Sequence, residues 1–366
     1  MGCDYLALAT PGVQTLHPYE TGKPIEELQR ELGLRHVVKL ASNENPLGPG
    51  QMARDAARRA LDQLHRYPDG AGFRLKAALC ERFGLDPEQL TLGNGSNDVL
   101  ELAGRAFLQR GDEVIFSEHA FAVYKLVTLG CSATPVEVPA RLYGHDLAAM
   151  VDAISERTRL IFLANPNNPT GTWFHRHAFD SFMARVPASV LVVLDEAYFE
   201  YIEEADYPNG LALLERYPNL IVTRTFSKIY GLASLRVGYA VANAQITDLL
   251  NRVRQPFNVN AAALAAAEAA LQDSNYIEDS KSENTAGLAQ IAEGLGKLGL
   301  QMIPSVANFI AFDCGRPALS LYQALLHEGV IVRPIGSYGL ANHLRVSIGL
   351  ADENERFLAA LTRVLS

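Results

Sequence analysis

The sequence predicts an α/β fold in which a large domain with a mostly parallel central sheet is followed by a smaller α+β domain. Three observations support this. Short apolar runs alternate with helical patterns, several of these runs are apolar at every residue, and the pattern changes after about residue 260. Strand–helix alternation is typical of layered α/β domains, and strands covered on both faces are apolar throughout. A chain of 366 residues is also long for one hydrophobic core, which favours two domains.

The clearest strands are the runs Leu-Ile-Phe-Leu-Ala at 160–164 and Val-Leu-Val-Val-Leu at 190–194. Helical spacing of apolar residues lies between such runs. In the first two thirds of the chain we expect strands at 37–40, 113–117, 134–138, 160–164, 190–194, 220–225 and 237–242, and helices at 51–65, 73–83 and 97–108.

Beyond residue 260 an alanine-rich helical run at 260–272 leads into a polar helical stretch that reaches residue 298. Isolated strands are expected at 308–313, 330–334 and 344–348, before a closing helix. The expected division is an N-terminal arm at 1–45 that joins the small domain and the substrate entrance, a large domain at 46–262 and a small domain at 263–366.

The composition argues against two classes of partner and is compatible with an enzyme that acts on small molecules. The net charge is −9 and the sequence pI about 5.5, without clusters of Lys or Arg, which argues against nucleic-acid binding and against an anionic membrane surface. The four cysteines are far apart and form no CxxC pair, as in proteins of a reducing compartment. The sequence shows no signal peptide and no membrane-spanning run, so we expect a cytoplasmic location.

Two loop segments could bind a ligand. Leu-Gly-Asn-Gly-Ser-Asn at 92–97 follows a short strand and precedes a helix, where free N–H groups favour anions. It lacks the third glycine of a dinucleotide fingerprint. Asn-Pro-Asn-Asn-Pro-Thr-Gly at 165–171 follows an expected strand, and ligands of open α/β sheets bind at such ends. Taken separately, the first segment could equally be a plain turn, and for the second a turn is the safer interpretation.

Two further segments carry charged groups beside apolar strands. Asp195 ends one apolar run, and a buried carboxylate needs a partner, although a helix N-cap would also explain it. Lys228 follows the next strand, with Arg236 eight residues later. A lysine at an apolar strand end is a candidate for covalent attachment of a carbonyl compound, although most lysines are simply exposed.

Together these segments resemble the fold-type I aminotransferases that depend on pyridoxal 5'-phosphate (PLP), in the subgroup of histidinol-phosphate aminotransferase. The resemblance covers nearly the whole chain. It is carried by Leu40-Ala-Ser-Asn-Glu-Asn-Pro46, Arg66-Tyr-Pro68, Gly93-Asn-Gly-Ser96, Asn165-Pro-Asn-Asn-Pro-Thr-Gly171, Asp195-Glu-Ala-Tyr198, Ser227-Lys228 with Arg236, and Leu344-Arg-Val-Ser347.

The resemblance implies a role for each matching residue. Lys228 would carry PLP covalently and move a proton at the substrate α-carbon. Asp195 would pair with the pyridinium nitrogen, while Asn168 and Tyr198 would hydrogen-bond the ring 3-oxygen. The other cofactor-binding residues it implies are Gly95, Ser96, Asn97, Thr225, Ser227 and Arg236, most of them at the phosphate.

Further residues are implied around the ring and the substrate. Phe121 would stack on the cofactor, and Arg345 would bind the substrate carboxylate with its planar fork. Tyr67 would reach the phosphate of a neighbouring subunit, which implies a homodimer with shared active sites. Tyr19, and Asn168 as well, would contact the substrate.

The expected reaction is amino transfer between L-histidinol phosphate and 2-oxoglutarate in histidine biosynthesis. An aromatic amino-acid aminotransferase, a PLP-dependent threonine-phosphate decarboxylase and a PLP-binding regulator remain alternatives; the last would need a basic DNA-binding extension. No metal is expected, because His175 and His177 have no suitable ligand nearby in the sequence. Departures from the family pattern are Ser234 in place of Gly, Asn97-Asp98 in place of Asp-Glu, and Glu118-His119 in place of Pro-Thr.

Overall fold

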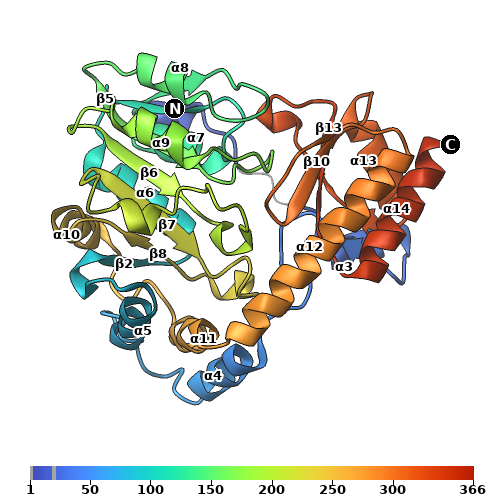
Figure 1. The fold of residues 1–366 in the computed structure, drawn as a ribbon, viewed down its shortest axis with the longest axis horizontal. Coiled ribbons are helices and arrows are strands. Elements are labelled where there is room, and N and C mark those ends of the chain that lie inside the picture. Colours follow the sequence, from blue (N-terminus) through green and yellow to red (C-terminus); the bar gives the residue numbers. More distant parts are fainter. Residues whose placement is uncertain (1–2, 19–21) are drawn as a thin grey trace.

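A computed structural model describes residues 3–18 and 22–366. Figure 1 shows two lobes, one built around a broad sheet and the other around a smaller sheet that lies against helices from the C-terminal part of the chain. The long helix α12 (Ser274–Lys297) starts beside α4 (Gln51–Leu61) and α11 (Ala261–Leu271) and runs into the second lobe.

The large sheet has seven strands in the order β2-β8-β7-β6-β5-β3-β4. The five strands from β7 to β4 are parallel, whereas β8 runs antiparallel to both of its neighbours. The expectation of a mostly parallel α/β sheet is therefore confirmed. The bounds are β2 (Leu90–Gly93), β3 (Glu113–Ser117), β4 (Thr134–Val138), β5 (Thr158–Ala164), β6 (Leu191–Asp195), β7 (Leu220–Thr225) and β8 (Gly238–Val241).

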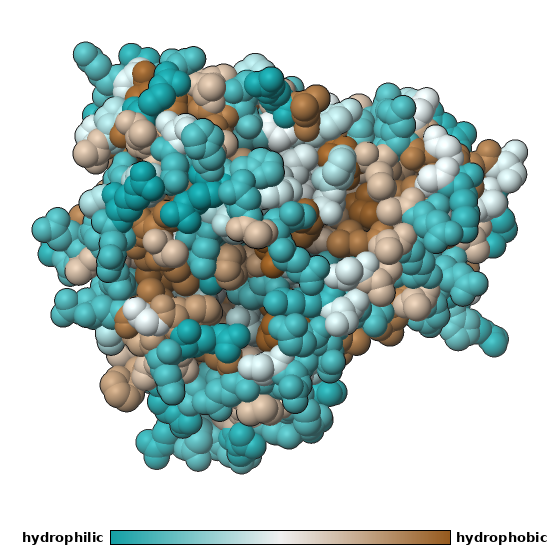
Figure 2. All heavy atoms as spheres, in the orientation of Figure 1, coloured by the Kyte–Doolittle hydropathy of each residue, from teal (hydrophilic) through white to brown (hydrophobic). Residues whose placement is uncertain are grey.

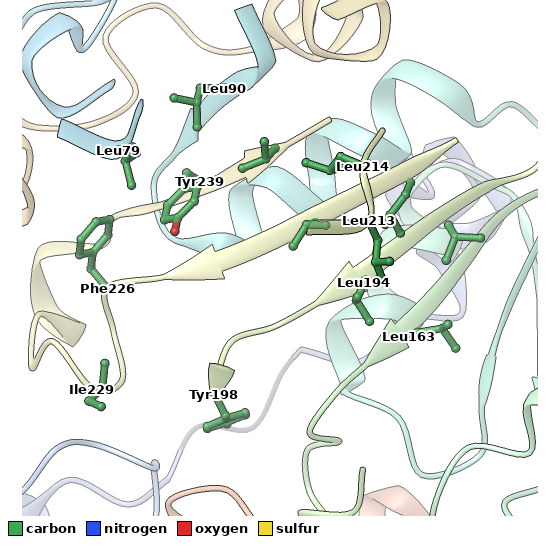
Figure 3. Packing of buried hydrophobic residues seen from close by; sticks show 14 of the residues in the cluster. Leu79, Leu90, Leu163, Leu194, Tyr198, Leu213, Leu214, Phe226, Ile229 and Tyr239 are labelled. Carbon is green, nitrogen blue, oxygen red and sulfur yellow. The ribbon is translucent and has the colours of Figure 1, made fainter. Parts of the chain in front are cut away.

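Each face of this sheet has its own core. Leu160 and Phe162 pack in the cluster with α6, α7 and α10, while Ile161 and Leu163 pack in the cluster with α5, α8, α9 and α11. Figure 3 shows part of the second cluster. Successive strand residues point to opposite faces, so covering both faces requires the uninterrupted apolar runs. The helices are α4 (Gln51–Leu61), α5 (Phe73–Phe83), α6 (Ser96–Phe107), α7 (Ala122–Gly130), α8 (Leu147–Asp152), α9 (Arg176–Met183), α10 (Ala244–Val253) and α11 (Ala261–Leu271).

The second lobe holds a four-stranded antiparallel sheet, β12-β13-β10-β9, and a two-stranded parallel pair, β1-β11. The arm before residue 46 contributes to this lobe, because Leu28 and Ala41 pack against Leu326 and Ile331. The elements are α3 (Ile25–Leu32), β1 (Val38–Lys39), β9 (Met302–Ile303), β10 (Phe309–Asp313), α13 (Ala318–His327), β11 (Val330–Ile331), β12 (Arg333–Pro334), β13 (His343–Ser347) and α14 (Ala351–Leu365).

Short elements complete the described chain. They are the helices α1 (Tyr5–Leu8) and α2 (Pro11–Gln14) and the 3-10 turns η1 (Pro87–Gln89), η2 (Phe199–Tyr201), η3 (Gly210–Leu213), η4 (Ala233–Leu235) and η5 (Gly336–Tyr338).

Several expected boundaries were wrong. The helix expected at 51–65 ends at Leu61, since residues 61–66 are exposed and no packing holds another turn. The strand expected at 330–334 is two strands that pair in different sheets. The strand at 190–194 shifts by one residue and includes Asp195. The domain boundaries at residues 45 and 262 stay a prediction.

The molecular surface is mixed in character. Figure 2 shows mostly hydrophilic atoms on one face, with hydrophobic atoms gathered in patches on both lobes. Exposed apolar side chains occur on α1 and around α4 and α5, among them Tyr5, Leu8, Leu64 and Phe73. Within residues 3–18 and 22–366, no helix has the length and apolar character needed to cross a bilayer.

Candidate active site

A pocket of about 300 Å³ opens where β5, β6 and β7 end. Ala164, Asp195 and Thr225 lie at the carboxyl ends of these parallel strands, the usual place for ligands in open α/β sheets. The structure brings together eleven of the residues predicted from sequence. These are Ser96, Asn97, Phe121, Asn168, Asp195, Tyr198, Thr225, Ser227, Lys228, Arg236 and, from the small lobe, Arg345.

Asp195 forms the floor of the pocket. Its carboxylate accepts hydrogen bonds from the hydroxyls of Tyr124, at 3.0 Å, and Thr223, at 3.1 Å. Burial raises the pKa of Asp195 to about 6, although these hydrogen bonds and Lys228 oppose the rise. Both hydroxyls are neutral donors and leave the negative charge of Asp195 unpaired. A cation next to this carboxylate would therefore stabilise its ionised form.

Lys228 lies in the loop after β7. Its Nζ donates to the carbonyl of Ser42 at 3.3 Å and lies 5.5 Å from the centre of the Tyr198 ring. Burial, and then the nearby charge of Arg345, lower the pKa of Lys228 to about 8. A lysine with such a pKa has a substantial neutral fraction near neutral pH, which is the nucleophilic form.

Tyr198 and Asn168 lie on the side of the pocket that faces the small lobe. The Tyr198 hydroxyl accepts from Nδ2 of Asn43 at 2.9 Å, and burial raises the pKa of Tyr198 to about 12. Tyr198 is therefore a neutral hydroxyl that can donate to a ligand oxygen. Arg345 donates to Oδ1 of Asn168 at 2.6 Å and to the carbonyl of Ala41 at 2.8 Å.

An anion cradle occupies the opposite end of the pocket. Ser96 begins α6, and Gly95 precedes it with φ of +86°, where an added Cβ would lie 2.6 Å from Nη2 of Arg236. Arg236 donates to Oγ of Ser227 at 3.2 Å. A helix N-terminus, hydroxyl groups and a guanidinium together favour a phosphate.

The cradle is compact because β8 begins with a glycine. A Cβ on Gly238 would come within 2.5 Å of the Ser96 nitrogen and 2.9 Å of the Gly95 carbonyl carbon. A larger residue would push the loop 93–96 off the sheet edge.

Three expected residues are not lining residues. Gly95 is the N-cap residue of α6 and precedes Ser96, which does line the pocket. The Tyr67 side chain is 83% exposed and stacks on Phe257 with ring centres 4.8 Å apart. Its assignment to a neighbouring subunit stays a prediction. Tyr19 lies outside the described residues.

The sequence reasoning missed several residues of the site. Tyr124 and Thr223 hold Asp195, Asn43 holds Tyr198, and Arg333 lines the pocket beside Arg345. Asn43 lies within the quoted motif at 40–46, and Thr223 shares a strand face with Thr225, so both carried a usable signal.

The remaining predictions concern metals. Folding brings Asp206, which is distant in the sequence, to 3.2 Å from Nδ1 of His175, and this single carboxylate does not complete a metal site. In the part of the chain that the structure describes, no cluster of three or more His, Cys, Asp or Glu could hold a metal ion.

The pocket fits PLP in three respects. A nucleophilic lysine lies within it, the cradle at α6 suits a phosphate, and the buried Asp195 suits a cationic ring nitrogen. Phe121, at the start of α7, adds an aromatic wall that meets Tyr124 edge to face.

Comparisons with known proteins agree with this fit. The family described as aminotransferase class I and II matches residues 35–361. The chain is similar to proteins named histidinol-phosphate aminotransferase 2 from Pseudomonas fluorescens, at 58% identity with 100% of both chains covered, and from Pseudomonas aeruginosa, at 59% identity with 99% of both covered.

A solved structure shows the same fold. It is the histidinol-phosphate aminotransferase of Sinorhizobium meliloti in complex with pyridoxal-5'-phosphate, with a TM-score of 0.91 and 30% identity, covering 98% of this chain and 97% of that one. The expected family and fold are confirmed, and the chain belongs to the class I and II aminotransferases.

Proposed function

We propose that the protein is a PLP-dependent aminotransferase that moves an amino group between L-histidinol phosphate and 2-oxoglutarate in histidine biosynthesis. The relatives that match the full length of the chain carry the name of this activity. The observation that supports it best is a pair of arginines at the substrate side of the pocket. Arg333 and Arg345 are register partners on β12 and β13, and both line the pocket.

Two guanidiniums suit a phosphate ester better than a single one would. A phosphate carries up to two negative charges and accepts several charge-assisted hydrogen bonds. Phe309 lies under Arg345, with the ring centre 5.2 Å from the guanidinium carbon, which keeps the fork in place. Glutamate could present its α-carboxylate to the same residues.

When bound, PLP supplies an electron-withdrawing ring that stabilises negative charge at the substrate α-carbon. The chain then has to hold and move protons around that carbon. Asp195 would stabilise the protonated ring nitrogen, and Tyr198 would donate to the ring oxygen. Lys228, with a pKa of about 8 when it is not bound to the cofactor, would take the proton from the substrate α-carbon and deliver it to the cofactor.

A ranking of substrates tests this proposal. Purified protein with bound PLP is given L-histidinol phosphate, phenylalanine or tyrosine with 2-oxoglutarate, and kcat/KM is measured for each. We expect the highest value for histidinol phosphate. A higher value for the aromatic amino acids would make the protein an aromatic amino-acid aminotransferase instead.

Arg345→Lys should weaken both half-reactions. Lysine keeps the charge but loses the planar fork, and the loss of one charge-assisted hydrogen bond costs about 1.5–3 kcal/mol. We therefore expect kcat/KM to fall by roughly one to two decades for both histidinol phosphate and glutamate, with normal PLP content. Arg316→Lys is the matched control, because Arg316 is exposed and donates to the carbonyl of Val364 in the small lobe. A loss confined to glutamate would contradict the shared use of Arg345.

We also infer a homodimer in which Tyr67 completes the partner's site. Its side chain is exposed in the single chain and so is free to reach another subunit. Lys228→Ala and Tyr67→Ala protomers, each of low activity, are mixed under conditions that exchange subunits. Every hybrid then has one doubly altered site and one intact site, so the activity per hybrid dimer should be about half that of the unaltered dimer. Hybrids that form without recovery would place Tyr67 outside the partner's site.

The cytoplasm is the inferred location. All four cysteines are free thiols in the structure, as expected in a reducing compartment. Cell fractionation followed by immunodetection would check it.

A further inference from the structure

We propose that Asp98, together with Asn258 and Arg254, is a positioning residue that fixes the two elements assigned to the cofactor phosphate. These elements are the loop 94–96 and the loop that carries Tyr67. The inference rests on the proposed PLP site. Asp98 itself is not among the described residues that line the pocket.

Asp98 holds the loop 94–96 through hydrogen bonds made outside the pocket. It lies in the first turn of α6, and its Oδ2 accepts from the backbone nitrogen of Asn94 at 2.8 Å. The same oxygen accepts from Nδ2 of Asn258, also at 2.8 Å. Asp98 thereby closes the turn between β2 and α6 and leaves the N–H groups at the start of α6 directed at the pocket.

Asn258 links this loop to a second one. Its Nδ2 also donates to the carbonyl of Leu92 at 3.1 Å, and its Oδ1 accepts from Nη1 of Arg254 at 2.8 Å. Nη2 of Arg254 donates to the carbonyl of Gly70 at 2.9 Å, three residues beyond Tyr67. Phe257, next to Asn258, stacks on the Tyr67 ring. A continuous series of hydrogen bonds therefore links Asn94 to the loop that carries Tyr67.

The role of Asp98 is geometric, because its charge opposes the ligand. A carboxylate near a phosphate site repels the phosphate, and only part of that repulsion is offset by Arg254 and by the helix N-terminus. Asn in place of Asp keeps an acceptor at the Oδ2 position with two lone pairs, enough for Asn94 and Asn258. Ala keeps neither bond.

The test separates phosphate binding from the rest of cofactor binding. Dissociation constants for PLP and for pyridoxal, which lacks the phosphate, are measured on the full chain after removal of its cofactor. For Asp98→Ala we expect PLP affinity to fall about tenfold through the two lost hydrogen bonds, with pyridoxal affinity and kcat at saturating PLP close to wild type. Asp98→Asn should restore PLP affinity to within about threefold of wild type.

Asp86→Ala is the matched control. Asp86 caps η1 ahead of β2 by accepting from the nitrogen of Glu88 at 2.9 Å, so its loss removes a comparable bond at the other end of the strand. It should leave the ratio of the two constants unchanged. If Asp98→Ala leaves the ratio of the PLP and pyridoxal dissociation constants unchanged, the positioning role of Asp98 is wrong. The proposed function would still be supported by PLP binding and turnover in the wild-type protein. A wild-type protein that fails to bind PLP would overturn both.

Discussion

Lys228→Ala is expected to abolish transamination and the visible absorption of the bound cofactor. The side chain provides the only lysine nitrogen among the described residues that line the pocket, so alanine removes both the proposed attachment point and the proposed proton-transfer group. Loss of the proton-transfer group alone costs typically 10²–10⁴-fold in rate. Loss of attachment adds to this, so residual turnover should fall below the assay limit.

Absorption spectra of the purified variant with added PLP, and single-turnover assays with histidinol phosphate, measure both effects. Lys76→Ala is the control, because Lys76 is also partly buried, with a pKa lowered by burial, yet it donates to the carbonyl of Leu90 outside the pocket. That variant should keep its spectrum and turnover. Wild-type spectrum and turnover in Lys228→Ala would remove the basis of the whole proposal.

The fold could be predicted from sequence because its core follows simple periodicities. The run at 160–164 is apolar at every residue because both faces of the sheet are covered. Such a run predicts both a strand and its place in a layer with helices on either side. What the pattern could not show is pairing. Residues 330–334 were expected to form one strand, yet Ile331 pairs with β1 and Arg333 with β13, because the chain crosses between two small sheets there.

Candidate site residues could be proposed from the sequence where a charged group follows an apolar strand, whereas residues that only support such a group could not. Lys228 and Asp195 stand out as charged groups at apolar strand ends. Arg224 stands on such a strand too, but it is 1% exposed and pairs with Glu196 at 2.7 Å. That partner lies 28 residues away and becomes a neighbour only through the parallel pairing of β6 and β7. Support of this kind depends on tertiary contacts that no local spacing encodes.

Asp195→Asn should lower kcat by about 10²–10³-fold, the usual cost of removing a group placed to stabilise transition-state charge. Asn can still hydrogen-bond the ring nitrogen but cannot stabilise its proton. The hydroxyls of Tyr124 and Thr223 should hold the amide much as they hold the carboxylate, so the fold should survive. Steady-state kinetics at saturating PLP and both substrates measure the loss. A decrease of less than about threefold would mean that a residue other than Asp195 pairs with the ring nitrogen.

The same variant isolates a pH effect on stability. The pKa of Asp195 in the folded chain, about 6, lies above its ordinary value of 3.8, so the buried charge costs stability above pH 6. As the pH falls through 6 the folded protein takes up a proton that the unfolded chain does not, and stability is regained. Without cofactor, the free energy of unfolding of wild type relative to Asp195→Asn should rise by about 1.4 kcal/mol from pH 7.5 to pH 5. With PLP bound, the cationic ring nitrogen keeps Asp195 ionised and the rise should disappear. Urea unfolding at the two pH values, with and without PLP, measures it, and an equal rise in both forms would mean that the cation is not at Asp195.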